Sequence, residues 1–288
     1  MSNRRKVIAF AIIGVLFLVA ASYGIGIFAW GHTQERTIQK AMTKAEQFSS
    51  VQDYSAAVKW YRKAAECGHS EAQFKLGEAY QEGKGVGKDL DKAVEWYRKA
   101  AEQDHVEAQF RLGEACQEGK GTIADMGKAV EWYRKAAEQD HAEAQFRLGE
   151  ACQEGKGTIA NMEKAVEWYR KAAEQDHVEA QFRLGEAYQE GKGTIADMEK
   201  AVEWYRKAAE CGHSEAQFRL GEAYQEGKGV EKDLDKAVEW NRKAAEQGHV
   251  GAQVILGARY YYGEGVEKNY AKAVEWFLKA AEQGDVSA

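Results

Sequence analysis

Tryptophan recurs at a fixed spacing along most of this 288-residue chain. Seven of its eight tryptophans stand 36 residues apart, at Trp60, Trp96, Trp132, Trp168, Trp204, Trp240 and Trp276. A segment close to AVEWYRKAAE surrounds each of the seven, and a second segment, close to EAQFRLGEAYQEGKG, precedes each copy after the first. A period of about 20–50 residues is typical of a chain that stacks copies of one supersecondary unit.

The repeat divides residues 33–288 into units of nearly equal length. A degenerate first unit occupies 33–70, and six full units follow at 71–106, 107–142, 143–178, 179–214, 215–250 and 251–286. The chain contains no proline and no strand-like alternation of polar and apolar residues. Because proline interrupts helices, its absence over this length favours helix throughout. We therefore predict an all-α fold, an α/α solenoid or superhelix.

Each unit is predicted to contain two helices. In the second, Ala93, Val94, Trp96 and Tyr97 fall on one face at helical spacing. Its predicted N-cap is Asp or Asn in every unit, as expected of a short side chain that accepts an orphan backbone N–H: Asp53, Asp89, Asp125, Asn161, Asp197, Asp233 and Asn269. Its end is marked by Gly68, Gly212, Gly248 and Gly284, or by Asp104, Asp140 and Asp176, at a position that suits a left-handed residue.

The first helix of each unit carries Ala72, Leu76, Ala79 and Tyr80 or their equivalents on one face, and it is predicted to end at Gly83. Together the two helices show the pattern A-x-x-x-L-G-x-x-Y-x-x-G-x-G, then K-A-x-x-W-Y-x-K-A-A. This pattern resembles that of the Sel1-like repeat family, helix-turn-helix repeats related to tetratricopeptide repeats. The resemblance covers about 33–288. It implies protein–protein binding or scaffolding, and it carries over no catalytic residue.

In tetratricopeptide-like solenoids the first helices line the concave face, so we expect Gln73, Lys75, Glu78 and their copies to be exposed there. These residues hardly vary along the chain. Cys116 and Cys152 replace the first-helix tyrosine and Asn241 replaces the second-helix tyrosine, but the last unit carries the largest group of departures. Partner-binding residues are therefore predicted at Ile255, Arg259, Tyr261, Tyr262, Phe277 and Leu278, most of which replace charged or polar consensus residues by apolar or aromatic ones. This end is predicted to bind a protein partner or a second copy of the chain.

Motifs for other chemistry are weak. His69, His105, His141, His177, His213 and His249 are in register, but side chains about 10 Å apart do not share one metal ion. We therefore assign them to helix starts or packing and predict no metal, cofactor or catalytic residues. Cys67, Cys116, Cys152 and Cys211 are predicted to be free and mostly buried. A net charge of −6 disfavours a nucleic-acid partner.

The first thirty residues differ from the rest. Arg4, Arg5 and Lys6 lie in a basic tail, 1–6, before an uncharged run at 7–30. A run of this length is enough to cross a bilayer. We predict a transmembrane signal-anchor helix, with the N-terminus in the cytoplasm and the repeats on the periplasmic side of a bacterial inner membrane. A cleaved signal peptide and a hydrophobic helix packed on its own protein are the alternatives.

Three classes of function follow from these observations. The first is a membrane-anchored protein-interaction adaptor or scaffold. The second is a dedicated inhibitor, such as an immunity protein that neutralises a toxin acting at the membrane or in the periplasm. The third, an enzyme, is disfavoured because every polar motif is repeated in each unit or serves a turn, whereas a catalytic pair is expected to be unique.

Overall fold

The computed structural model describes residues 34–284, which form helices and connecting turns without any strand. A helix over 34–50 comes first. The helices that follow are α2 (Tyr54–Glu66), α3 (Ser70–Glu82), α4 (Leu90–Ala101), α5 (Val106–Glu118), α6 (Met126–Glu138), α7 (Ala142–Glu154), α8 (Met162–Glu174), α9 (Val178–Glu190), α10 (Met198–Glu210), α11 (Ser214–Glu226), α12 (Leu234–Glu246), α13 (Val250–Tyr262) and α14 (Tyr270–Glu282). The predicted all-helical class is confirmed for this part of the chain.

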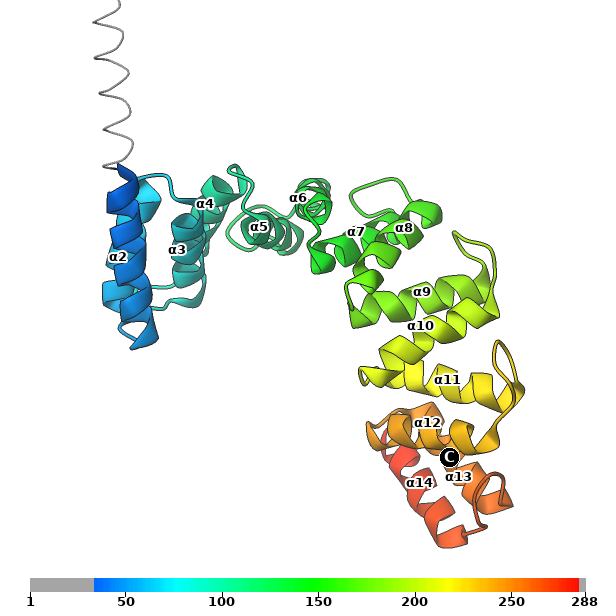
Figure 1. Cartoon of the computed structure of the whole chain (residues 1–288). Helices are drawn as coiled ribbons and strands as arrows, with labels where there is room; N and C mark the ends of the chain where they lie inside the picture. The colour runs from blue at the N-terminus through cyan, green and yellow to red at the C-terminus, as the bar shows by residue number, and fades with distance from the viewer. Residues whose placement is uncertain (1–33, 285–288) are drawn as a thin grey trace, which may run out of the picture. The chain divides into compact units, whose positions relative to one another are not determined.

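The helices belong to two compact units, which adjoin in the chain at Ala124 and Asp125. In the first unit each helix from α2 to α5 packs against the next along the chain (Figure 1). In the second unit the same holds from α6 to α14. Contacts restricted to sequence neighbours are the defining property of a solenoid, so the predicted solenoid architecture is confirmed within each unit.

Helix starts follow the predicted capping chemistry. Asp89 accepts a hydrogen bond from the backbone N–H of Lys92 at 3.0 Å, and Asn161 accepts one from Lys164 at 2.9 Å. The first helix of each unit begins at a histidine instead. His177 Nδ1 accepts from the N–H of Ala180 at 3.1 Å. The helix-start role predicted for these histidines is therefore confirmed.

Helix ends also have the predicted backbone conformation. Gly68, Gly212, Gly248 and Gly284 have positive φ, and Asp104, Asp140 and Asp176 take the same place at φ 61°, 61° and 60°. An aspartate in this left-handed region costs more backbone energy than glycine. The first helices end at left-handed glycines such as Gly83, where φ is 76°.

The tryptophans and tyrosines that share one face of the second helices differ in burial. The fully buried aromatic side chains are the tyrosines that follow the tryptophans, Tyr97, Tyr133, Tyr169 and Tyr205. Each tryptophan is only half-buried, and a lysine ammonium lies over its outer face. Lys207 Nζ, for example, is 3.9 Å from the ring centroid of Trp204. The indole therefore has one face on the helices and one under a cation, whereas the adjacent tyrosine occupies the core.

The cysteine prediction holds in part. All four are free, as predicted, but only Cys116 and Cys152 are buried. Cys67 is half-buried and Cys211 is exposed. These two lie at the C-caps of α2 and α10, where the helix has already turned away from the core.

The predicted localisation needs correction. Within residues 34–284 no helix has both the length and the apolar character needed to cross a membrane. A position in a bacterial inner membrane with periplasmic repeats is therefore not supported, and we withdraw it. The basic tail at 1–6 and the predicted anchor at 7–30 lie outside the described residues.

Candidate interaction surfaces

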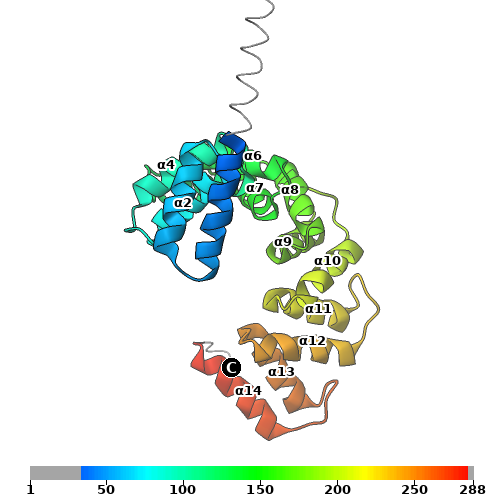
Figure 2. The same ribbon diagram turned by 60° about the vertical axis from the view of Figure 1, so that its left-hand side comes forward.

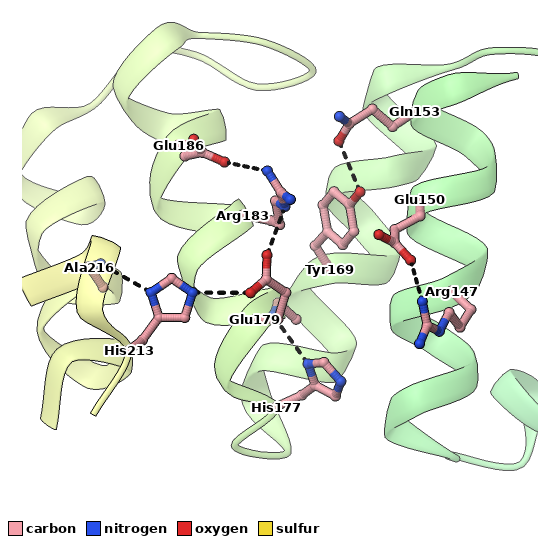
Figure 3. Close-up of polar contacts among 11 residues, drawn as sticks. Arg147, Glu150, Gln153, Tyr169, His177, Glu179, Arg183, Glu186, His213 and Ala216 are labelled. Carbon is pink, nitrogen blue, oxygen red and sulfur yellow. Dashed lines mark hydrogen bonds and ion pairs between the residues drawn. The ribbon is translucent and has the colours of Figure 1, made fainter. Parts of the chain in front are cut away.

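The first helices carry a repeated polar cluster, which we call the Glu–Arg–Glu ladder. On α9, Arg183 lies between two carboxylates, with its Nε 3.1 Å from Glu179 and its Nη1 3.1 Å from Glu186 (Figure 3). The spacing of four and three residues places all three side chains on one face of the helix. The other members are Glu71–Lys75–Glu78, Glu107–Arg111–Glu114, Glu143–Arg147–Glu150 and Glu215–Arg219–Glu222.

A histidine joins each of several clusters to the next repeat. His213 Nδ1 accepts from the N–H of Ala216 at 3.1 Å, so its proton is on Nε2, which donates to Glu179 at 3.0 Å (Figure 3). The imidazole also stacks on Phe182, with ring centroids 4.5 Å apart. The hydrogen bond from His213, together with the charge of Arg183, lowers the pKa of Glu179 below its ordinary value.

The ladder is more enclosed than the sequence predicted. Gln73, expected to be exposed, is buried and donates to the carbonyl of Ala65 at 3.2 Å. It also accepts from Gln103 at 2.7 Å. Lys75 and Glu78 are half-buried and form an ion pair with each other, with Nζ of Lys75 2.9 Å from Oε2 of Glu78. Each cluster pairs its single cation with two carboxylates, so its charged groups are engaged within the molecule while the ladder keeps a net negative charge.

An open groove of about 570 Å³ lies beside the ladder in the first unit. Its lining includes Tyr97, Arg111, Glu114 and Ala115. Arg111 and Glu114 form an ion pair at 3.0 Å across its wall. The groove lies between repeats, and its lining also carries the charged side chains of Glu82, Lys88, Glu118 and Lys120.

The last repeat interrupts the ladder. Gly251, Ile255 and Ala258 stand where the earlier repeats have Glu, Arg or Lys, and Glu. Ile255 is half-buried on α13. The chain therefore replaces an ion-paired surface by an apolar one at this repeat.

Most of the predicted partner-binding residues lie in one region, which we call the terminal surface. Exposed side chains there are Tyr261 (46 %), Tyr262 (66 %) and Leu278 (58 %), while Phe277 is half-buried. Two further residues were missed, Tyr270 and Val274, each 56 % exposed. Tyr261 contacts the edges of Tyr262 and Tyr270 at centroid distances of 4.9 and 5.3 Å, which joins α13 to the start of α14.

Of these two residues, Tyr270 departs from the repeat consensus, whereas Val274 does not. Tyr270 replaces the Leu or Met of the internal full repeats, for example Met198, and this change was available as a signal. Val274 is a consensus residue, and its equivalent Val238 is buried. Only the structure shows that no described helix covers Val274.

Arg259 lies inside the molecule, although the sequence placed it among the partner-binding residues. It is 3 % exposed and donates from Nη2 to Gln225 at 2.7 Å. In other repeats a buried tyrosine makes this contact: Tyr205 donates to Gln189 at 2.9 Å. Asn241 occupies that tyrosine position in the repeat before Arg259. The guanidinium of Arg259 thus makes the hydrogen bond to glutamine that a tyrosine hydroxyl makes in other repeats.

This replacement leaves polar atoms unpaired. Both polar side-chain atoms of Asn241 and the Nε of Arg259 are buried without a hydrogen-bond partner. Burial also lowers the pKa of Arg259 from its ordinary value. The interface between α12 and α13 is consequently less well satisfied than the tyrosine-containing ones.

The architecture and the surfaces define an α-helical repeat protein in which polar groups that recur from repeat to repeat hold those repeats together. The Sel1 repeat model matches residues 48–69, 70–105, 106–141, 142–177, 178–213, 214–249 and 250–285. The chain belongs to the Sel1 repeat family. The Sel1 solenoid is a protein-interaction fold.

Two solved structures are closely similar. A protective antigen of uropathogenic Escherichia coli with an SLR fold is 38 % identical, with a TM-score of 0.83 over 90 % of this chain. The chain spans 56 % of the length of that antigen. A Sel1 repeat protein from Oxalobacter formigenes is 36 % identical, with a TM-score of 0.70 over 83 % of this chain and 96 % of its own. Among the curated proteins no sequence matches this chain.

A third similarity is weaker. An immunity protein from Pseudomonas aeruginosa is 20 % identical, with a TM-score of 0.39 over 74 % of this chain and 81 % of its own. This level of similarity carries no argument about function.

Proposed function

We propose that the protein is an interaction scaffold that binds a protein partner through the terminal surface. The observation that carries this proposal is the group of Tyr261, Tyr262, Tyr270, Val274 and Leu278, all exposed on the last two helices. Clustered exposed apolar side chains mark interaction sites because they gain free energy when a partner removes them from water. Tyrosine in particular is enriched at the centres of interfaces.

The substitutions at this end strengthen the proposal. In internal repeats, Arg206 donates to Tyr224 of the next repeat at 3.3 Å, and Arg242 donates to Tyr260 at 3.0 Å. Leu278 stands at the corresponding position of the last repeat. An arginine exposed at that place would favour solubility, whereas leucine favours contact with another apolar surface.

The experiment places a photo-crosslinking amino acid at Tyr262 or, as a matched control, at Glu226, the same repeat position one unit earlier. We expect a discrete protein to be crosslinked at 262 and not at 226. Changing Leu278→Arg in the same chain is expected to reduce this crosslink at least severalfold. Equal capture at both positions, or capture that is insensitive to Leu278→Arg, would contradict the proposal.

The same experiment distinguishes a scaffold from a dedicated inhibitor. Under the inhibitor alternative, the crosslinked protein is a toxin whose activity falls when the purified chain is added. Under the scaffold reading, the captured protein keeps its own activity in the complex. The terminal surface is compatible with both roles, and the activity of the captured protein in the complex distinguishes them.

A further inference from the structure

The turn that joins α13 to α14 in the last repeat (Figure 2) differs in chemistry from the turns of the earlier repeats. In the preceding repeat the corresponding turn holds an ion pair, with Nζ of Lys228 2.6 Å from Oε2 of Glu226. Four earlier turns hold the same pair: Glu82–Lys84, Glu118–Lys120, Glu154–Lys156 and Glu190–Lys192. In the last repeat these two positions carry Tyr262 and Glu264. An ion pair within the chain is thus replaced by an aromatic ring and a carboxylate.

The backbone of this turn keeps the conformation of the earlier one. Gly263, between Tyr262 and Glu264, has φ 82°, and its counterpart Gly227 has φ 71°. The N–H of Glu264 donates to the carbonyl of Arg259 at 3.1 Å, and the equivalent hydrogen bond of the preceding repeat is also 3.1 Å long. Side chains at these two positions are near enough to form an ion pair in the preceding repeat. The ring of Tyr262 and the carboxylate of Glu264 therefore occupy neighbouring places on the surface.

The carboxylate of Glu264 is exposed and has no cation within ion-pair distance among residues 34–284. The charge that acts on it is the guanidinium of Arg259, which is buried and donates to Gln225. In the other repeats, this position carries the lysine that pairs with the glutamate before the turn. The last repeat therefore presents a negative charge to solvent where the others present a neutralised pair.

Exposed aromatic faces elsewhere in the chain carry a cation of their own. Each of the seven repeat tryptophans has a lysine Nζ 3.9–4.4 Å from its ring centroid. Lys268 lies 5.0 Å from the ring centroid of Tyr270. Within the described part of the chain, no cation lies within the usual 6 Å of Tyr261 or Tyr262, although these rings are 46 % and 66 % exposed. Their faces are open to a cation from outside.

The two rings also hold each other in place. Tyr261 and Tyr262 meet edge to face, with an interplanar angle of 85° and centroids 4.9 Å apart. This arrangement does not stack the two faces on each other, and the face of a phenol ring carries the negative part of its quadrupole. The turn therefore combines a fixed, electron-rich ring face with an adjacent carboxylate.

We propose that this turn binds an arginine side chain of the protein partner, with the guanidinium stacked on Tyr262 and paired with the carboxylate of Glu264. The inference rests on the proposed function, because it names the chemistry that the terminal surface recognises. A planar guanidinium stacks on an aromatic ring and bonds a carboxylate with two parallel N–H groups, whereas a lysine ammonium is a strongly hydrated point charge. A basic partner segment also complements the net charge of −6.

The first test titrates the full-length chain, isotope-labelled in its tyrosine rings, with N-acetyl-arginine amide. The matched probe is N-acetyl-citrulline amide, which has nearly the same shape but no charge. We expect the ring resonances of Tyr261 and Tyr262 to shift on addition of the arginine probe, with an affinity at least about fivefold higher than for the citrulline probe. Equal responses to the two probes, or shifts confined to other tyrosines, would overturn the proposal.

The second test removes the site without disturbing the turn. Tyr262→Glu combined with Glu264→Lys rebuilds the ion pair of the preceding repeat, so the fold should be kept, as circular dichroism can verify. The affinity for the arginine probe, followed at Tyr261, is expected to fall at least about fivefold. The control is Glu231→Gln, which removes an exposed carboxylate of the preceding repeat and changes the net charge by the same amount. An equal loss in this control would assign the response to overall charge and contradict a specific site.

The third test builds the site elsewhere. Glu226→Tyr with Lys228→Glu gives the turn of the preceding repeat the same ring and carboxylate. We expect the new tyrosine resonance to shift with the arginine probe and much less with the citrulline probe. A folded chain whose new tyrosine responds to neither probe would contradict the assignment of binding to these two positions.

Failure of this inference differs from failure of the proposed function. If residue 262 crosslinks a partner in a manner that depends on Leu278, but the chain shows no preference for the arginine probe, the scaffold role stands and the arginine site is wrong. If the arginine probe binds selectively but no protein is captured at 262, the cation site stands and the scaffold role fails.

Discussion

The internal repeats and the last repeat share one backbone design but differ in how their side chains join neighbours. Between α9 and α11, polar groups link one repeat to the next: His213 donates to Glu179, and Arg206 donates to Tyr224. In the last repeat, leucine replaces this arginine and glycine replaces this glutamate, at Leu278 and Gly251. A polar group that bridges repeats is useful only where a next repeat supplies its partner. On α14, which no helix within residues 34–284 follows, the same positions are available for docking.

The largest expected contrast concerns leucine. Leu184 is fully buried on α9, and Leu278 is 58 % exposed on α14. We expect Leu184→Ala to lower the free energy of unfolding by about 2–5 kcal/mol, because it removes contacts and leaves a cavity. Leu278→Ala should change it by less than about 0.5 kcal/mol. Urea denaturation measures both. Similar losses would mean that the terminal surface is part of the core.

The second prediction concerns Asn241 and Arg259, which together stand in for the buried tyrosine of the other repeats. Asn241→Tyr alone should destabilise the chain, because the new hydroxyl competes with Arg259 for Gln225. Combined with Arg259→Ala, it restores the internal pattern and should add about 1–3 kcal/mol to the free energy of unfolding. A double-mutant cycle by denaturation measures the coupling. Additive effects of the two changes would show that the two sites are independent.

The third prediction concerns one missing hydrogen bond. Gln175 and Gln247 donate to Gln145 and Gln217 at 2.8 Å. Cys211 stands at the equivalent position, and the Oε1 of Gln181, which would be its acceptor, is buried without a partner. Cys211→Gln should therefore stabilise the fold by about 1 kcal/mol.

The control for this change is Cys211→Ala, which supplies no donor and should leave stability nearly unchanged. The thermal midpoints of the two variants give the comparison. An equal gain from alanine would assign the effect to removal of the cysteine and not to the new hydrogen bond.

The smallest expected effect is on pH dependence. Hydrogen bonds from His177 and His213 lower the pKa values of Glu143 and Glu179. The unfolded chain therefore holds these protons more tightly than the folded chain. The resulting stabilisation is complete above the ordinary glutamate pKa and is lost as the pH falls through the lowered values. Both carboxylates are partly exposed, so the contribution is small.

His213→Gln should move the acid-unfolding midpoint of the second unit to slightly higher pH. Ile255→Gln in the last repeat serves as a control that affects no ladder carboxylate, because Gly251 and Ala258 replace the two glutamates there. It should leave the acid midpoint in place. Circular dichroism followed from pH 7 downward measures both variants. An equal shift in the two would show that the ladder does not set the acid stability.

Much of the helical framework was predictable because it is encoded locally. The Asp and Asn N-caps, the glycines at helix ends and the 36-residue period are short-range signals, and the structure confirms them. The degree of burial was less predictable. Trp204 and Tyr205 are adjacent and both aromatic, yet the tyrosine is in the core and the tryptophan is half-buried under Lys207. A helical period gives the direction of a side chain but not how far the neighbouring helix extends over it.

The candidate site shows the same division. Tyr261, Tyr262 and Leu278 were identifiable because they break a pattern that the other repeats keep. Arg259 breaks the pattern too, but its role depends on Asn241, eighteen residues earlier, and on the position of Gln225. A departure from the repeat consensus does not by itself show whether a residue is exposed to a partner or makes a buried hydrogen bond that replaces one lost elsewhere in the core.

The sequence by itself determined that this chain is a helical Sel1 repeat array and that its last repeat is different. Both properties follow from the 36-residue repeat and from the residues that depart from it. The tertiary structure decided which exceptions are exposed. Val274 keeps the consensus residue and is exposed, while Arg259 departs from it and is buried. The physical reason is that burial depends on which helix packs next to a residue. For the internal repeats that helix lies in the next repeat, whereas no helix within residues 34–284 follows α14.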